Sequence, residues 1–257
     1  MRDPHVKSLI YKITYDEKGV SYNDPPALEE EWDAFRVRLD GGKAVVDMKE
    51  HHADEGCARS VVEPFLRAWE VYTDLTLSRG NLGFEFVRSQ IVDRDPPKKG
   101  ESQVMAAEPG HYVHAGKPVT GHITRREYPA PPSAFRLTPE VKMLWPQYQA
   151  FLDGHRSLSH IAGFFVSVLE DQFKGAHKRR DAAKHYNIEY DVIDKLAELA
   201  ATRGGSEARK RTGTVKEFSP AEETWIRTTI RKLIRRAGDD LDPLPAKITM
   251  ADLPELS

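Results

Sequence analysis

The sequence predicts an α+β fold, with an N-terminal antiparallel sheet and packed helix in a ββαβ-like order and an all-helical C-terminal domain. Apolar residues alternate with a period of two before residue 50 and recur at three- and four-residue steps after residue 54. Proline-rich segments at 95–100 and 128–132 precede the C-terminal helices. We therefore expect domains at 1–95 and 134–240, a Pro/Gly-rich connecting region at 96–133, and an extended tail at 241–257.

The first 50 residues carry the signals of strands and of one tight hairpin. Two apolar alternations flank the segment 40–43, whose two glycines can adopt the positive φ angles of a hairpin turn. The prolines at 25–26 and the three glutamates at 29–31 predict a loop before this hairpin. The alternating apolar positions are Leu9, Tyr11, Ile13 and Tyr15, then Phe35, Val37 and Leu39, and finally Ala44, Val46 and Met48.

A long helix is expected after residue 54, followed by another strand. Apolar residues from Ala58 to Tyr72 share one helical face, which indicates packing on the sheet. Pro64 falls inside this pattern and predicts a kink or a break. Gly80 is typical of a helix stop, and the alternation from Leu82 to Phe86 begins the next strand.

Five helices are predicted after residue 138. Thr138 and Pro139 are typical of an N-cap and a first helical position, and Gly154 ends that helix. Ser219 and Glu222 form a capping box before the last helix, and Gly238 stands where a left-handed C-terminal glycine belongs. The remaining helices are expected near 158–173, 178–186 and 189–202.

Composition is that of an ordinary globular protein rather than a disordered or membrane-spanning one. The chain has 257 residues, of which 39% are hydrophobic and 30% charged. The longest apolar run, residues 161–169, is far shorter than the roughly 20 residues that a bilayer requires. Cys57 is the one cysteine, which excludes an internal disulfide, and we expect it to be at least half-buried. We expect a cytoplasmic protein without membrane contact and without a cofactor.

The segment from Ala183 to Leu196 is similar to the helix-turn-helix of the lac-repressor family. In that family a small residue, a turn residue and buried aliphatic residues recur at fixed positions, and the resemblance implies DNA binding. The acidic residues of the second helix argue against DNA binding, because phosphates repel carboxylates. A helical hairpin with a purely structural role fits the same pattern. The matching positions are Ala183, Asn187, Ile188, Ile193 and Leu196, and the acidic ones are Glu189, Asp191, Asp194 and Glu198.

Arg180 and His185 resemble the Arg-x4-His motif of HEPN ribonucleases. The resemblance implies that these two residues meet across a helical dimer and cleave RNA without a metal. A histidine can move the 2′-hydroxyl proton near neutral pH, while an arginine stabilises the charge on phosphorus. A solvated helix face explains the same spacing, so both interpretations stay open.

Two groups of histidines could supply metal ligands. His111, His114 and His122 lie in one glycine-containing segment, with Glu108 and Glu127 near them. His51 and His52 precede Asp54 and Glu55 in another. Neither group has the spacing of a known motif such as His-Glu-x-x-His, so we expect no metal.

The last helix carries a row of cations. Arg227, Arg231 and Arg235 are four residues apart and therefore share a face, with Lys232 and Arg236 beside them. Such a face is either solvated or binds an anionic partner, which could include nucleic acid. No P-loop, dinucleotide-binding or nucleophile-elbow motif is present in the sequence. The sequence therefore favours a non-catalytic interaction or regulatory protein with a protein partner or a second copy of itself, and a ribonuclease or a helix-turn-helix module as alternatives.

Overall fold

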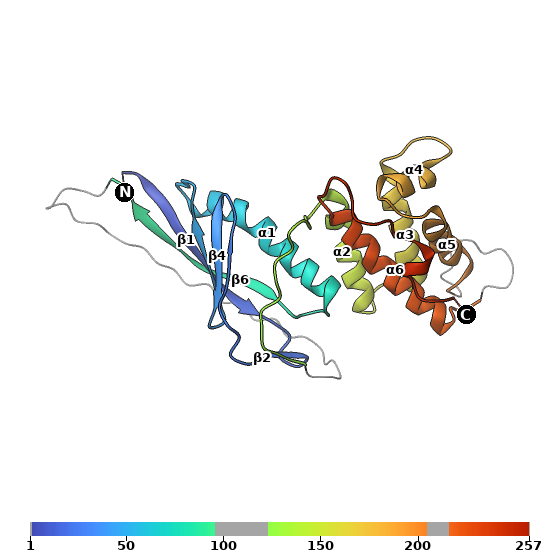
Figure 1. Cartoon of the computed structure of the whole chain (residues 1–257), viewed down its shortest axis with the longest axis horizontal. Coiled ribbons are helices and arrows are strands. Elements are labelled where there is room, and N and C mark those ends of the chain that lie inside the picture. Colours follow the sequence, from blue (N-terminus) through green and yellow to red (C-terminus); the bar gives the residue numbers. More distant parts are fainter. Residues whose placement is uncertain (1, 96–122, 205–215, 257) are drawn as a thin grey trace. The chain divides into compact units, whose positions relative to one another are not determined.

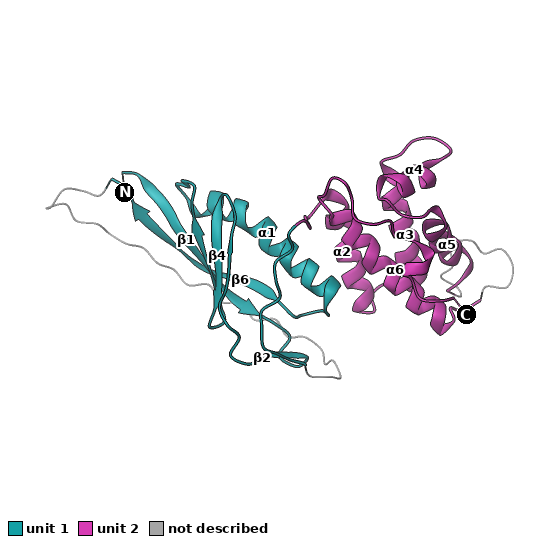
Figure 2. Ribbon diagram, viewed as in Figure 1, with its two compact units in different colours: residues 1–133 teal, residues 134–257 magenta. Residues whose placement is uncertain are grey.

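The structure, a computed structural model, describes residues 2–95, 123–204 and 216–256. It is an α+β protein with two compact units, residues 1–133 and residues 134–257 (Figures 1 and 2). Each unit has its own buried core. No helix among the described residues is long and apolar enough to cross a bilayer.

The first unit is built on a five-stranded antiparallel sheet with the strand order β3-β4-β5-β1-β6. A separate parallel pair joins two short strands, β2 and β7. The strands are β1 (Pro4–Thr14), β2 (Val20–Tyr22), β3 (Leu28–Glu31), β4 (Phe35–Asp40), β5 (Lys43–Met48), β6 (Gly83–Asp93) and β7 (Ile123–Arg125).

The predicted hairpin is confirmed as β4 and β5. Gly41 and Gly42 have φ angles of 52° and 76°, so the turn uses the conformational freedom that only glycine has at no steric cost. Phe35, Val37 and Leu39 are buried, and the residues between them are exposed. The period-two pattern thus separates a core face from a solvated face.

The predicted loop at 29–31 is wrong, because these glutamates lie in the edge strand β3. Glu29 stands opposite Arg38 in the register, and Glu31 stands opposite Arg36. Glu29 forms ion pairs with both arginines, and Lys49 contacts Glu31 at 2.6 Å. Opposite charges across the strands compensate for the low strand propensity of glutamate.

Helix α1 (Glu55–Thr76) covers one face of the sheet. Asp54 caps it by accepting a hydrogen bond from the Cys57 amide. The predicted break at Pro64 does not occur, and the helix runs through this residue (Figure 1). Its buried side packs on strand residues in one cluster, and this packing compensates for the backbone hydrogen bond that proline cannot make.

The second unit consists of five helices and a docked tail. Thr138 and Ser219 cap the first and last helices as expected, and the Ser219–Glu222 capping box is complete. The helices are α2 (Pro139–Leu152), α3 (Leu158–Asp171), α4 (Lys178–His185), α5 (Tyr190–Thr202) and α6 (Pro220–Gly238), and a 3-10 turn, η2, spans Met250–Asp252.

Gly238 has a different role from the one predicted. It is the last residue of α6 and is not among the residues with positive φ. A Cβ atom built on it would lie within 3 Å of the Phe135 ring and of the Arg136 carbonyl. Glycine is therefore required by close packing, not by a left-handed helix cap.

Candidate functional site

Helix α6 presents three of its arginines on the side opposite to its buried stripe. Trp225, Ile226, Ile230, Leu233 and Ile234 are all fully buried. Arg227 and Arg235 are exposed, and Arg231 is partly exposed. These three arginines, which we call the arginine ladder, therefore lie along the solvent-facing side of a helix that is anchored by its apolar side.

Arg227, the first arginine of the ladder, lies against an aromatic ring of α2. The Arg227 guanidinium lies over the Phe151 ring, 4.6 Å from its centroid, and 3.9 Å from a Glu223 carboxylate oxygen. Burial raises the pKa of Tyr148, and the positive charges of Arg231 and Arg227 oppose this rise. Arg227 thus packs on an aromatic ring of α2.

Beyond Glu223, which contacts Arg227, the exposed face of α6 carries threonine and basic residues. Thr224 is exposed about one turn before Arg227, and Thr228 is partly exposed between Arg227 and Arg231 along the helix. From Thr224 to Gly238 the sequence contains no carboxylate. The two acidic residues of the helix stay in its first turn, where they suit the helix dipole.

Lys232 and Arg236, which the sequence analysis grouped with the ladder, make contacts inside the unit. The Lys232 ammonium donates to the Asp252 carbonyl at 2.8 Å. Arg236 is buried, and its guanidinium donates to the carbonyls of Tyr186, Asn187 and Ala246 at 2.7–2.9 Å. Its Nε lies 3.2 Å from an Asp239 carboxylate oxygen.

Arg236 therefore joins three segments: α6, the turn between α4 and α5, and the tail. Burial lowers its pKa, and the neighbouring Asp239 carboxylate opposes this effect. The helical period predicts only that Arg236 lies on the buried side of α6, because it follows the buried Leu233 by three residues. A cation at that position needs internal acceptors.

Arg180 and His185, the candidate ribonuclease pair, are both exposed on α4. The Arg180 guanidinium lies 5.8 Å from the centroid of the Tyr190 ring. The His185 ring makes edge contacts with Phe173 and Tyr186, at centroid distances of 5.6 and 4.7 Å. Within one chain the two side chains thus have different neighbours, and a catalytic role for the pair stays a prediction.

The segment that resembles a helix-turn-helix does form two helices joined by a tight turn. Ala183, Ile188, Ile193 and Leu196 are buried, and Asn187 occupies the turn with a φ of 49°. Such burial satisfies both interpretations of the pattern, since a DNA-binding unit and a structural hairpin need the same core.

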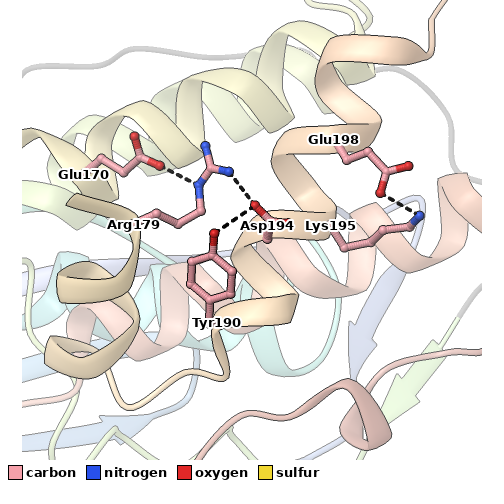
Figure 3. Close-up of polar contacts among 6 residues, drawn as sticks. All are labelled: Glu170, Arg179, Tyr190, Asp194, Lys195 and Glu198. Atoms are coloured by element: carbon pink, nitrogen blue, oxygen red, sulfur yellow. Dashed lines mark hydrogen bonds and ion pairs between the residues drawn. The ribbon is translucent and has the colours of Figure 1, made fainter. Parts of the chain in front are cut away.

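The acidic residues of α5 are partly neutralised by neighbours (Figure 3). Arg179 donates to Glu170 of α3 at 2.8 Å and to Asp194 of α5 at 2.6 Å, so it ties α4 to both helices. Lys195 contacts Glu198 at 2.9 Å on the same face. This face of α5 offers no excess of cations to phosphate.

The C-terminal tail occupies the start of α5. The Glu189 amide donates to the Ile248 carbonyl, and the Met250 amide donates to the Glu189 carboxylate, both at 2.7 Å. The Asn187 side chain also donates to the Pro245 carbonyl at 2.9 Å. A recognition helix contacts bases through its N-terminal residues, and here the tail lies against that end.

The candidate metal ligands are only partly within the described residues. His111, His114 and His122 lie outside them. His51 stacks on His5 of β1, with ring centroids 5.4 Å apart, and its Nε2 lies 3.5 Å from Asp3. No local pattern points to this neighbour, because residues 5 and 51 meet only through the tertiary fold. No set of three suitable side chains is arranged for a metal among the described residues.

Cys57 is exposed, contrary to the expectation that it would be at least half-buried. It lies in the first turn of α1, where the Asp54 cap points toward it. The hydrogen bond and the negative charge of Asp54 raise the pKa of the thiol. This environment disfavours a reactive thiolate.

The comparisons with known proteins identify no relative of this chain. The chain matches no family model, no curated protein and no solved structure.

Proposed function

We propose that this protein is a non-catalytic interaction or regulatory protein, and that α6 of its helical unit binds an anionic partner through Arg227, Arg231 and Arg235. The observation that carries the proposal is the exposed face of α6, where three arginines are aligned and the helix contains no carboxylate from Thr224 to Gly238.

The ladder is suited to binding for two physical reasons. Guanidinium groups bind carboxylates and phosphates with two parallel hydrogen bonds, which are stronger than neutral ones. The Phe151 ring lies under Arg227, so part of the conformational entropy lost on binding is already lost in the free protein.

The partner that we propose acts in the cytoplasm. An exposed free thiol such as Cys57 supports a reducing compartment, where thiols stay unpaired. A protein partner or a second copy of the chain can supply the anionic groups, as can nucleic acid.

The test is a pull-down from cell lysate at low and high salt, comparing wild type with the triple variant R227Q/R231Q/R235Q. Ladder-dependent binding should be lost in the variant and should weaken with salt in the wild type. The stability should change little, since exposed ion pairs contribute about 1 kcal/mol or less each. Identical partner profiles would contradict the proposal.

A matched control variant removes three positive charges elsewhere in the helical unit. Lys174, Lys178 and Lys184 are exposed on α4 and the loop before it, so K174Q/K178Q/K184Q is the corresponding triple variant. This control should keep the partners of the wild type.

The HEPN-like ribonuclease is the alternative that a specific observation supports, because Arg180 and His185 are both exposed on α4. The helix-turn-helix alternative is weaker. The tail lies at the N-terminal end of α5, and the acidic residues of that helix would face phosphates.

A further inference from the structure

We infer that the anionic partner of the ladder is the sugar–phosphate backbone of nucleic acid, bound without reading of the base sequence. This inference rests on the proposed function and narrows it from any anion to one class of polymer.

The first argument is the absence of an apolar anchor on the ladder face. Protein interfaces have a core of apolar and aromatic residues, which supplies most of the binding energy. Among the described residues, the exposed large hydrophobic side chains all lie outside α6. The aromatic residues beside the ladder, Tyr148 and Phe151, are themselves buried. On α6 itself a protein partner would find charge but no exposed large hydrophobic side chain.

The second argument is the chemistry of the side chains that are present. Arginines and threonine hydroxyls are common donors to phosphate oxygens. Arg227, Arg231, Arg235 and Thr228 give the face this composition. Nucleic-acid interfaces are more polar and more positively charged than protein interfaces, as this face is.

The third argument is the spacing of the charges. Residues four apart on a helix are separated by about 6 Å along the axis, so the ladder extends over about 12 Å. Phosphates of one DNA strand advance by about 3.4 Å per nucleotide along the duplex axis. Over about 12 Å one strand presents roughly three to four phosphates, so the three guanidinium groups span a short stretch of backbone.

Helix α6 packs against α2, α3 and α5, so one side of it is exposed. The exposed side of α6 can lie against the backbone from outside, a contact that carries no sequence information.

The experiment is a fluorescence-anisotropy titration of the full chain with labelled nucleic acids over a salt series from about 50 to about 200 mM. The probes are two duplex DNAs of unrelated sequence, a single-stranded RNA and a poly-glutamate peptide. We expect similar affinities for the two duplexes and a linear fall of log K with log salt. Binding to poly-glutamate should be much weaker.

The variants isolate the ladder. In R227Q/R231Q/R235Q the salt slope should decrease by about 2.7 for duplex DNA, or by about 2.1 for a single strand, if each arginine contacts one phosphate. The variant R227K/R231K/R235K keeps the three charges and should keep most of the slope. The control K174Q/K178Q/K184Q should leave the contribution of the three ladder arginines to the salt slope unchanged.

The outcomes separate the inference from the proposed function. Ladder-dependent binding of poly-glutamate or of a lysate protein, with no binding of nucleic acid, would overturn the inference and leave the function standing. No ladder-dependent binding of any probe or lysate protein would overturn both. If K174Q/K178Q/K184Q loses as much binding as the ladder variant does, the binding depends on the overall charge of the helical unit. That result would overturn the role of the ladder.

Discussion

At the scale of single residues, Asp74 of α1 is a carboxyl group whose ionisation is strongly affected by its environment. It is largely buried near the end of the helix, where its carboxylate accepts a hydrogen bond from the Gly80 amide at 2.9 Å. Burial raises its pKa to about 7, although this hydrogen bond opposes the rise. Desolvation disfavours the charged form more than one amide donor stabilises it.

The raised pKa of Asp74 predicts a pH-dependent stability. Between about pH 4 and pH 7 the folded state holds the proton more tightly than the unfolded state, so the free energy of unfolding should fall as the pH rises through this window. Asp74→Asn keeps an acceptor for Gly80 and removes the charge. The variant should be more stable than wild type at pH 8, by at most about 4 kcal/mol.

Chemical denaturation at several pH values measures this effect. Asp33→Asn changes the same charge at an exposed position and serves as the control. Glu70, whose pKa is also raised by burial, leaves a residual slope in the Asp74 variant. Equal pH dependence in wild type and Asp74→Asn would show that Asp74 ionises freely in the fold.

Residue roles were predictable where the helical period decides them. The alignment of Arg227, Arg231 and Arg235 follows from their spacing alone. The internal contacts of Arg236 and Lys232 depend on where the turn after α4 and the tail lie, and no local pattern encodes those positions. The same limit applies to His5, which meets His51 across the fold.

At the scale of elements, the sequence predicts best those structures that local chemistry specifies. The β4–β5 hairpin, the Thr138 cap and the Ser219 capping box depend on residues within a few positions of each other. Strand β3 was missed because its glutamates are stabilised by cations of neighbouring strands and loops. Of the kink or break expected at Pro64, the break does not occur, because packing on the sheet outweighs the cost of the proline.

Helix α4 is the element on which the ribonuclease alternative depends. If Arg180 and His185 are catalytic, the purified protein should cut single-stranded RNA in the presence of EDTA, and His185→Ala should abolish cutting. Since His185 is exposed, its replacement should leave the thermal midpoint nearly unchanged.

His177→Ala provides the matched control, because His177 is an exposed histidine at the start of the same helix. It should cut RNA as the wild type does. Absence of metal-free cutting across varied RNAs, or equal cutting by His185→Ala, would remove the enzyme alternative.

At the scale of the whole molecule, the chain divides into a sheet unit and a helical unit. Residues 128–129 belong to the first, since the Trp69 indole donates to the Pro129 carbonyl and the Tyr128 hydroxyl accepts from Gly42. Proline-rich segments indicated joints in the sequence, but the sequence did not show that 128–132 would pack on the sheet unit. That packing depends on tertiary contacts.

The helical unit closes on itself at both ends. The Arg136 amide donates to the Gly238 carbonyl at 2.7 Å, and the Asp240 amide donates to the Ala134 carbonyl at 2.8 Å. The tail adds Ile248 and Leu253 to the buried residues. A fragment of residues 134–257 therefore retains these contacts and its own core.

The most direct measurement is the unfolding of this fragment, followed by circular dichroism beside the full chain. We expect residues 134–257 to express as a soluble helical domain with one cooperative transition, and to bind the partners of the full chain only while Arg227, Arg231 and Arg235 are intact. A fragment that is molten or insoluble, together with a single shared transition in the full chain, would contradict the division into two units and the placement of the binding face on one of them.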